Sequence, residues 1–314
     1  GALLDSRPAA RPSADSAHRI LSEGEAGSWW RARVEEAISR GSSDLWLRRG
    51  AFALPLCGRE GELERLTALW AEVSAERPRG AAVLLCGQSG AGKSHLVQAF
   101  VEGLRQGQRP PLALFARLSD DSETQPFGNG LELLRRFLLL PEGSAPTERE
   151  QRLVRSRVAP IEAEALLAAL DPRSTRAIEG SVSLALARFF AGEAQRFPLV
   201  LVLEDVHHAR SATLGAIARF AQAFAGVPAL LLLTLDPEAD PARPAELAQL
   251  LERLTHPEGS VRPLVRIELA PLGQEAVQDL VQRCFHHGVP RLRLARVLWE
   301  RSRGNPGLIS ELLE

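Results

Sequence analysis

An apolar run that stops at a glycine-rich loop constrains the fold of this chain more than any other feature. Residues 81–86 read Ala-Ala-Val-Leu-Leu-Cys, and the loop Gly87-Gln88-Ser89-Gly90-Ala91-Gly92-Lys93-Ser94 follows at once. The loop matches the pattern G-x-x-x-x-G-K-[ST], and residues 93–105 after it have the pattern of a helix. A continuous apolar run is typical of a strand buried on both faces of a parallel sheet. The sequence therefore predicts a strand, a phosphate-binding loop (the phosphate loop, residues 87–94) and a helix.

The residue types in the phosphate loop suit polyphosphate binding. Its glycines let the backbone turn so that successive amides point inward, where they act together with the positive end of the following helix. Lys93 is the only lysine in the chain, and its compact ammonium reaches between phosphates where a planar guanidinium fits poorly. We expect Lys93 to contact the β- and γ-phosphates and the Ser94 hydroxyl to ligate Mg²⁺. The predicted cofactor-binding segment is Gly87, Gln88, Ser89, Gly90, Ala91, Gly92, Lys93, Ser94 and His95.

A second apolar run, residues 199–203, ends in the acidic pair Glu204-Asp205. Mg²⁺ prefers carboxylate oxygens near the phosphates, and a catalytic water needs a nearby base. An acidic pair at the tip of a strand can supply both. We expect Glu204 to serve Mg²⁺ and Asp205 to activate the water, although the sequence also allows the two roles to be exchanged. Lys93, Glu204 and Asp205 are the predicted catalytic residues, and Ser94 and Glu204 the predicted Mg²⁺ ligands.

Apolar runs alternate with helical periodicity along the rest of the chain. Further strands are predicted at residues 112–118, 229–235 and 264–269, and helices at 59–76, 131–140, 147–158, 161–170, 182–196, 212–225, 245–254, 274–286, 292–302 and 308–313. This alternation indicates a parallel sheet covered on both faces, whose ligands bind at the carboxyl ends of the strands. The predicted fold class is a three-layer α/β P-loop NTPase with a central parallel sheet, followed by a small helical lid.

The composition, with 45% hydrophobic and 25% charged residues, is that of a soluble globular protein. The net charge is −1 and no basic groove is visible, so we expect neither nucleic acid nor a membrane as a partner. Three widely spaced cysteines argue against a disulfide framework and for a reducing, cytoplasmic compartment. Cys284 lies near His286 and His287, but no second ligand pair completes a tetrahedral zinc site.

Four motifs, in order, resemble one family. They are Cys57-Gly58-Arg59-Glu60-Gly61-Glu62-Leu63, the phosphate loop, Leu201-Val202-Leu203-Glu204-Asp205-Val206-His207 and Gly304-Asn305-Pro306. Together they resemble the AAA-related signalling ATPases, the origin-recognition-like AAA domains grouped with STAND NTPases. The resemblance implies ATP or ADP as the nucleotide, with Arg59 beside it and Pro306 against the adenine. It also implies an extra strand between the phosphate-loop strand and the acidic strand, and hydrolysis of the β–γ phosphoanhydride.

The chain departs from the family pattern at two places. His207-His208-Ala209-Arg210 stands where the family more often has His-Trp-Ala-Asp, and Asp236 stands where relatives often carry an arginine that senses the γ-phosphate. ATP binding is therefore better supported than fast hydrolysis, and we expect slow turnover. For His207 and His208, polar contacts near the site and a simple helix N-terminal turn remain equally open.

The chain begins with Gly1 and contains no methionine, so we expect a segment of a longer polypeptide. Its residues 3–14 are similar to the end of protein kinase domains, which implies a Ser/Thr kinase fused to the ATPase, although the segment lacks the kinase catalytic motifs. The predicted divisions are a kinase remnant at 1–22, a linker at 23–50, an ATPase domain at 51–256 and a helical lid at 257–314.

The leading hypothesis is a nucleotide-controlled switch in a bacterial signalling or regulatory protein. The nucleotide would set the angle between sheet domain and lid, and other domains of the same polypeptide, an N-terminal kinase and an effector, would be the partners. The alternative is a catalytically decayed nucleotide-binding scaffold that mediates protein–protein interaction. The missing arginine favours the scaffold and the retained lysine favours the switch. The sequence leaves the oligomeric state open.

Overall fold

The computed structural model describes residues 54–107, 109–118, 128–138, 140, 144–155, 158–171, 179–239, 245–257, 262–285 and 291–313. The predicted kinase remnant and linker lie outside these residues, as do His286 and His287. The strands are β1 (Ala81–Cys86), β2 (Leu112–Arg117), β3 (Leu199–Glu204), β4 (Ala229–Leu235) and β5 (Val265–Glu268). The helices are α3 (Glu60–Val73), α4 (Lys93–Arg105), α5 (Gly128–Phe137), α6 (Pro146–Arg155), α7 (Pro160–Leu170), α8 (Glu179–Arg196), the short 3₁₀ turn η5 (Val206–His208), α9 (Ser211–Phe224), α10 (Ala245–Thr255), α11 (Gln274–Cys284), α12 (Arg291–Ser302) and α13 (Pro306–Leu313).

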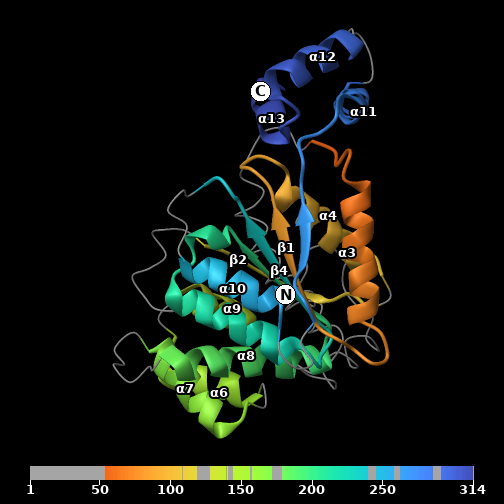
Figure 1. The fold of residues 1–314 in the computed structure, drawn as a ribbon. Helices are drawn as coiled ribbons and strands as arrows, with labels where there is room; N and C mark the ends of the chain where they lie inside the picture. The colour runs from red at the N-terminus through yellow and green to blue at the C-terminus, as the bar shows by residue number, and fades with distance from the viewer. Residues whose placement is uncertain are drawn as a thin grey trace, which may run out of the picture.

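The five strands form one parallel sheet in the order β2-β3-β4-β1-β5 (Figure 1). Strand β4 separates β1 from β3, which confirms the extra strand that the family resemblance implied. Every residue of β1, β3 and β4 is buried, and this explains why their sequences are continuous apolar runs without alternation. Because all strands run in the same direction, the phosphate loop after β1 and the acidic pair after β3 lie at the same edge of the sheet.

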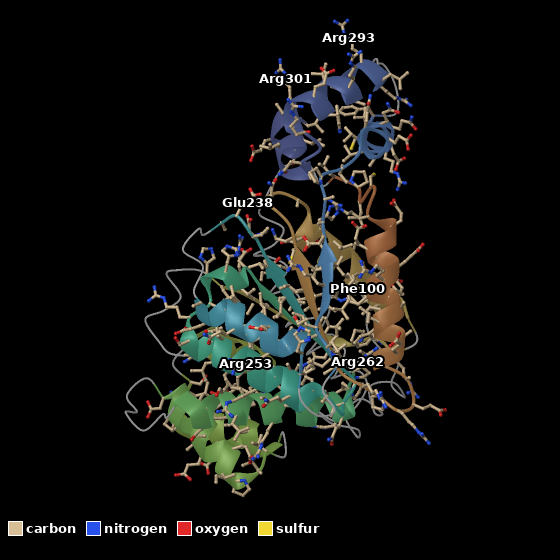
Figure 2. The ribbon with its side chains drawn as sticks, in the orientation of Figure 1. Phe100, Glu238, Arg253, Arg262, Arg293 and Arg301 are labelled. Atoms are coloured by element: carbon tan, nitrogen blue, oxygen red, sulfur yellow. The ribbon has the colours of Figure 1, made fainter. Side chains whose placement is uncertain are left out.

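Helices cover both faces of the sheet, which confirms the predicted three-layer α/β fold class. Helices α3 and α4 pack on one face, and α5, α8, α9 and α10 pack on the other (Figure 1). Phe100 of α4 is fully buried between its helix and the sheet (Figure 2). Burial of such a side chain contributes about 1.5–3 kcal/mol, so these apolar helix faces hold the layers together.

Helices α11, α12 and α13 form a small unit beyond the carboxyl edge of the sheet (Figure 1). This helical lid has a core of its own that includes Leu280, Leu298 and Ile309. Strand β5 falls within the predicted lid segment but pairs with β1, and its Ile267 is fully buried in the sheet core. The helical part of the lid therefore begins at α11, and the division at residue 256 stays a prediction.

The ends of several elements differ from the expected ones for local reasons. Helix α13 begins at Pro306 rather than Leu308, because proline suits the first helical position and Asn305 Oδ1 accepts hydrogen bonds from the N–H groups of Gly307 (2.9 Å) and Leu308 (3.2 Å). Helix α11 ends at Cys284.

No helix among the described residues is both long and apolar enough to cross a bilayer.

Candidate nucleotide site

The phosphate loop joins β1 to α4 at the carboxyl edge of the sheet. Gly90 and Gly92 have φ values of 78° and 90°, a left-handed conformation that glycine adopts without steric penalty. Gly92 is the N-cap of α4, whose first residue is Lys93. The loop therefore ends at a helix N-terminus, where amides lack helical partners and the helix dipole favours negative charge.

The carbonyl oxygens of residues 87–91 all accept hydrogen bonds from the protein. The donors are Lys93 Nζ to Gly87 (2.6 Å) and Gln88 (3.0 Å), Asn305 Nδ2 to Ser89 (2.8 Å), the Gly307 N–H to Gly90 (2.9 Å) and Arg59 Nη2 to Ala91 (3.0 Å). Among the described residues, no acceptor is present for the amides of Ser89, Gly90 and Gly92. The loop therefore has its carbonyls satisfied and a set of amide donors left for an anion.

Lys93 is buried within the loop, in a strongly acidic environment. Burial lowers its pKa, while the carboxylates of Asp236, Asp205 and Glu204 oppose that shift by favouring the charged ammonium. The ammonium donates only to neutral carbonyls of the loop, and a phosphate oxygen is a better acceptor for a charged donor. His95, the third residue of α4, is half-buried, and burial lowers its pKa.

The structure brings together the two predicted Mg²⁺ ligands from distant parts of the chain. The Ser94 hydroxyl donates to Glu204 Oε1. Glu204 is buried, and desolvation raises its pKa to about 7, although the hydrogen bond from Ser94 opposes the shift. A hydroxyl and a carboxylate are hard oxygen donors that suit Mg²⁺, and a cation here would favour the ionised form of Glu204. The residues present therefore fit this ion.

Glu204 bonds to Ser94, whereas Asp205 bonds to Arg117. Asp205 has a left-handed backbone (φ 58°, ψ 48°), and its N–H donates to Thr234 Oγ1 at 2.9 Å. Its Oδ2 accepts from Arg117 Nε at 2.8 Å and Nη2 at 2.7 Å. Sequence reasoning missed Arg117 as a site residue. The available signal was a charged residue that ends an otherwise apolar strand at the same edge of the sheet as the acidic pair.

Arg59 and Pro306, which the family resemblance assigned to the nucleotide, both lie against the phosphate loop. The Arg59 side chain is buried and also donates to the Ala270 carbonyl (2.6 Å) and pairs with Glu62 (3.1 Å). Its two terminal nitrogens thus bond to protein groups and tie the loop to two other segments, while its buried Nε has no hydrogen-bond partner among the described residues. The Pro306 ring lies beside Gly92, since a Cβ built on that glycine would be 3.8 Å from Pro306 Cγ.

The turn after β4 forms another flank of the site. Asp236 Oδ1 accepts the Glu238 N–H at 2.9 Å, and both carboxylate oxygens of Glu238 lie 2.9 Å from Gln88 Nε2. Glu238 lies at the edge of the sheet that faces the lid (Figure 2). His207 Nδ1 accepts the Asp236 N–H at 3.4 Å, so His207 makes a polar contact near Lys93 while it also lies in the turn η5. Burial, and then the neighbouring His208, lower the pKa of His207.

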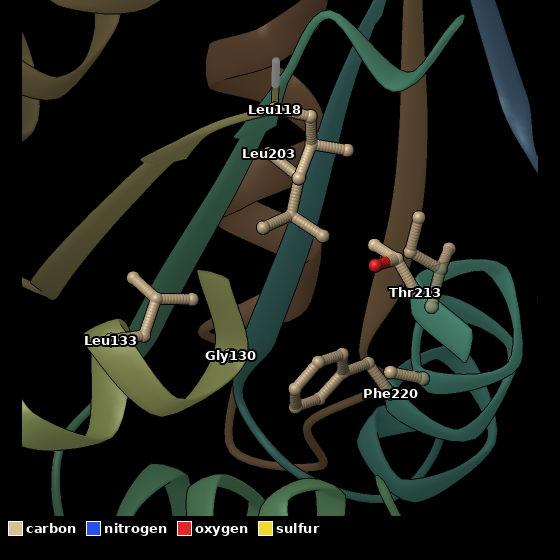
Figure 3. Close-up of a pocket in the computed structure, with 8 residues that line it drawn as sticks. Leu118, Gly130, Leu133, Leu203, Thr213 and Phe220 are labelled. Atoms are coloured by element: carbon tan, nitrogen blue, oxygen red, sulfur yellow. The ribbon is translucent and has the colours of Figure 1, made fainter. Parts of the chain in front are cut away.

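An apolar pocket lies elsewhere, between the ends of β2 and β3 and helices α5 and α9 (Figure 3). Its lining includes Leu118, Leu133, Leu203, Thr213 and Phe220. The cavity volume is about 20 Å³, enough for about one water molecule. It therefore has neither the size nor the polar groups for a nucleotide. Among the described residues, no cluster of three or more His, Cys, Asp or Glu side chains could hold a metal ion.

A family model matches this chain, and two solved structures are similar to it. A family model described as an AAA ATPase domain matches residues 55–235, more than half of the chain. The fold is similar to that of Cdc6p from Pyrobaculum aerophilum, with a TM-score of 0.52 and 13% identity over 85% of this chain and 62% of that one. A STAND protein with a tetratricopeptide repeat sensor from Pyrococcus horikoshii also matches, with a TM-score of 0.44 and 12% identity over 81% of this chain and 29% of that one.

The chain thus spans less than two thirds of the length of each of these two solved structures. A search of curated proteins found no significant match. The family match covers the segment from just before the Arg59 motif to the end of β4, which contains the phosphate loop and the acidic pair. The chain therefore belongs to the AAA ATPase domain family of nucleotide-binding P-loop ATPases.

Proposed function

We propose that this domain binds ATP with Mg²⁺ in the phosphate loop, hydrolyses it slowly, and acts as a nucleotide-controlled switch within a longer polypeptide. One observation carries the proposal. The loop's carbonyls are satisfied by protein donors, while the amides of Ser89, Gly90 and Gly92 have no acceptor among the described residues and the buried Lys93 ammonium donates to neutral carbonyls. A polyphosphate tail supplies the negative oxygens that such an arrangement binds.

The site residues divide the work by their geometry. The amides of Gly90 and Gly92, with the Lys93 ammonium, would hold the β- and γ-phosphates. Ser94 and Glu204 would hold Mg²⁺, which when bound neutralises charge on the phosphoryl oxygens. Asp205, whose Oδ2 bonds to Arg117 while Glu204 accepts from Ser94, is the residue that we assign to orienting the attacking water and accepting its proton.

Two features support slow rather than fast turnover. Arg117 holds the Asp205 carboxylate through two nitrogen donors to Oδ2, so the carboxylate is not free to turn toward a water and only Oδ1 is left to accept a proton. By the family resemblance, Asp236 stands where relatives often carry an arginine, a cation that would stabilise the charge developing on the transferred phosphoryl group. Its negative charge cannot supply that stabilisation.

The switch part of the proposal rests on the lid. Residues Asn305 to Gly307 contact the phosphate loop directly, with Pro306 beside Gly92. We propose that Pro306 also contacts the bound nucleotide. Arg59 would stabilise the loop through its hydrogen bond to the Ala91 carbonyl. Nucleotide occupancy would then change the free energy of the lid's position, and other domains of the polypeptide would respond to it.

The test begins with equilibrium titration of Mg·ATP into the wild-type protein and two variants, Lys93→Ala and Lys93→Arg. We expect both variants to bind at least tenfold more weakly, since a charged hydrogen bond contributes about 1.5–3 kcal/mol and a guanidinium does not fit the loop. Exposed Arg188→Lys, on α8, is the matched control. Equal affinity of wild type and Lys93→Ala would reject the phosphate loop as the binding site.

The rate of ATP hydrolysis separates the switch from the decayed scaffold. The aspartate at position 236 favours the scaffold. Phosphate release by the wild type should exceed that of Asp205→Asn by at least tenfold, because general base catalysis contributes at least about 10² to such steps and amide substitution removes it. A wild type that binds Mg·ATP but releases no more phosphate than Asp205→Asn would establish the scaffold reading.

A further inference from the structure

The lid touches the phosphate loop through a short segment between α12 and α13. Asn305 Nδ2 donates to the Ser89 carbonyl at 2.8 Å, and the Gly307 N–H donates to the Gly90 carbonyl at 2.9 Å. From this contact we infer that Asn305 is a positioning residue, which holds a peptide plane of the phosphate loop in the orientation that phosphate binding requires. The inference rests on the proposed function and names how the lid acts on the site.

Peptide planarity gives the contact its effect. The Ser89 carbonyl and the Gly90 N–H belong to one trans peptide and point in opposite directions. When Asn305 holds this carbonyl on the lid side, the Gly90 N–H must face the inside of the loop. Arg59 does the same for the peptide plane between Ala91 and Gly92. Its bond to the Ala91 carbonyl turns the Gly92 N–H inward. Two side chains from outside the loop therefore orient two of its amides.

The fit between lid and loop leaves no room for side chains. A Cβ built on Gly90 would lie 2.4 Å from Asn305 Oδ1, and a Cβ built on Gly307 would lie 2.8 Å from Gly90 Cα. Real Cβ atoms do not come this close to other heavy atoms. Glycine at both positions thus permits a direct backbone contact, in which a small displacement of the lid breaks the hydrogen bonds.

The Asn305 side chain is fixed at both ends. Its Oδ1 caps α13 by accepting from Gly307 and Leu308, while its Nδ2 reaches the loop. The preceding Gly304 is held by the Leu272 N–H, which donates to its carbonyl at 2.8 Å, and by Ser302 Oγ, which accepts from its N–H at 3.1 Å. The segment is therefore a rigid extension of the lid core.

Because the contact is rigid, nucleotide affinity and lid position are linked. A lid that has moved away leaves the Ser89–Gly90 plane free to rotate, and a bound phosphate that requires the inward amide favours the seated lid by the same factor. This role differs from a contact with the adenine, because it acts on the phosphate end of the nucleotide.

The chain offers a substitution that separates positioning from helix capping. Asn305→Ser keeps a good N-cap acceptor for α13 but is too short and lacks the amide donor to reach the Ser89 carbonyl. Asn305→Ala loses both the cap and the donor. Glu311→Gln, exposed on α13, is the matched control. The probes are a fluorescent Mg·ATP analogue and inorganic tripolyphosphate, which displaces it and has no base.

We expect both Asn305 variants to bind each probe about two- to tenfold more weakly than wild type, the factor for one lost neutral hydrogen bond. Glu311→Gln should bind as the wild type does. The positioning role is overturned by either of two results: Asn305→Ser retains wild-type affinity, whatever Asn305→Ala does, or the variants bind the analogue more weakly but bind tripolyphosphate as the wild type does.

A measurement without nucleotide keeps this inference separate from the proposed function. In the nucleotide-free protein, hydrogen exchange at Ala91, whose N–H donates to the Gln88 carbonyl at 3.1 Å, should be faster in Asn305→Ser than in wild type or Glu311→Gln, because release of the preceding peptide plane loosens this turn. Unchanged exchange would refute the positioning role even if nucleotide binds. If the wild type binds no nucleotide but exchange is still faster in Asn305→Ser, the proposed function is refuted. The effect of the Asn305 contact on the loop then still holds.

Discussion

Substitution of alanine for Gly90 should loosen the lid, whereas the same substitution at Gly92 should not. Both glycines have positive φ, so alanine at either position carries a backbone strain of about 1–2 kcal/mol. The two positions differ in what a Cβ would meet. At Gly90 it would lie 2.4 Å from Asn305 Oδ1, and at Gly92 the nearest atom is Pro306 Cγ at an ordinary contact distance of 3.8 Å.

The structure sets the size of the difference. Relief of the clash at Gly90 requires Asn305 to move, which breaks its bond to the Ser89 carbonyl and disturbs the cap of α13. A neutral hydrogen bond and an N-cap each contribute about 1 kcal/mol. The seated lid should therefore be about 2 kcal/mol less stable in Gly90→Ala than in Gly92→Ala, a factor of about 30 in the opening equilibrium.

Native-state hydrogen exchange measures this opening directly. We expect the amides of α12 and α13 to exchange at least about tenfold faster in Gly90→Ala than in Gly92→Ala. The backbone strain is common to both variants, so it should lower the free energy of global unfolding similarly in each. Equal exchange of the lid helices in the two variants would refute the conclusion that the lid rests on the loop through Asn305.

Two further predictions concern the acidic pair. Arg117→Gln should raise turnover up to about fivefold, because a half-exposed ion pair contributes up to about 1 kcal/mol and its loss frees Asp205; a fall in phosphate release would show that Arg117 assists the reaction instead. Burial raises the pKa of Glu204 from its ordinary 4.5 to about 7, so the folded, nucleotide-free protein binds more protons than the unfolded chain between these values and its stability should fall as pH rises through this window. Glu204→Gln should remove that contribution in denaturant titrations at pH 5 to 8, and in wild type Mg²⁺-dependent nucleotide binding should weaken below about pH 7, where a proton competes for the carboxylate. Identical pH dependence of wild-type and Glu204→Gln stability would contradict the buried, proton-sharing environment assigned to Glu204.

Much of the fold was predictable because burial on both faces leaves a simple trace in the sequence. Strands β1, β3 and β4 are continuous apolar runs, and each ends at the edge of the sheet where the phosphate loop or a polar turn begins. The phosphate loop was predictable because its glycines and its lysine are required by backbone geometry and charge, not by tertiary context. The pairing of Ser94 with Glu204 followed from the phosphate loop and the end of β3 lying at one edge of a parallel sheet.

The contacts that restrain the site were not predictable from the sequence. Arg117 and Asp205 lie 88 positions apart, and Ser89 and Asn305 lie 216 positions apart. In a chain whose basic residues are almost all arginine, the charged end of β2 did not by itself identify Arg117 as the partner of Asp205. Asn305 also has a sufficient local explanation as a helix cap, so its second bond to the loop becomes visible only when the lid is placed against the sheet.

The most direct measurement is a crystal structure of the protein grown with excess Mg²⁺ and a non-hydrolysable ATP analogue. We predict that the triphosphate occupies the phosphate loop, that Lys93 Nζ leaves the Gly87 and Gln88 carbonyls to contact phosphate oxygens, and that the ion lies between Ser94 and Glu204. A loop that stays empty at saturating ligand, with Lys93 still bonded to its own carbonyls, would contradict the assignment of this site.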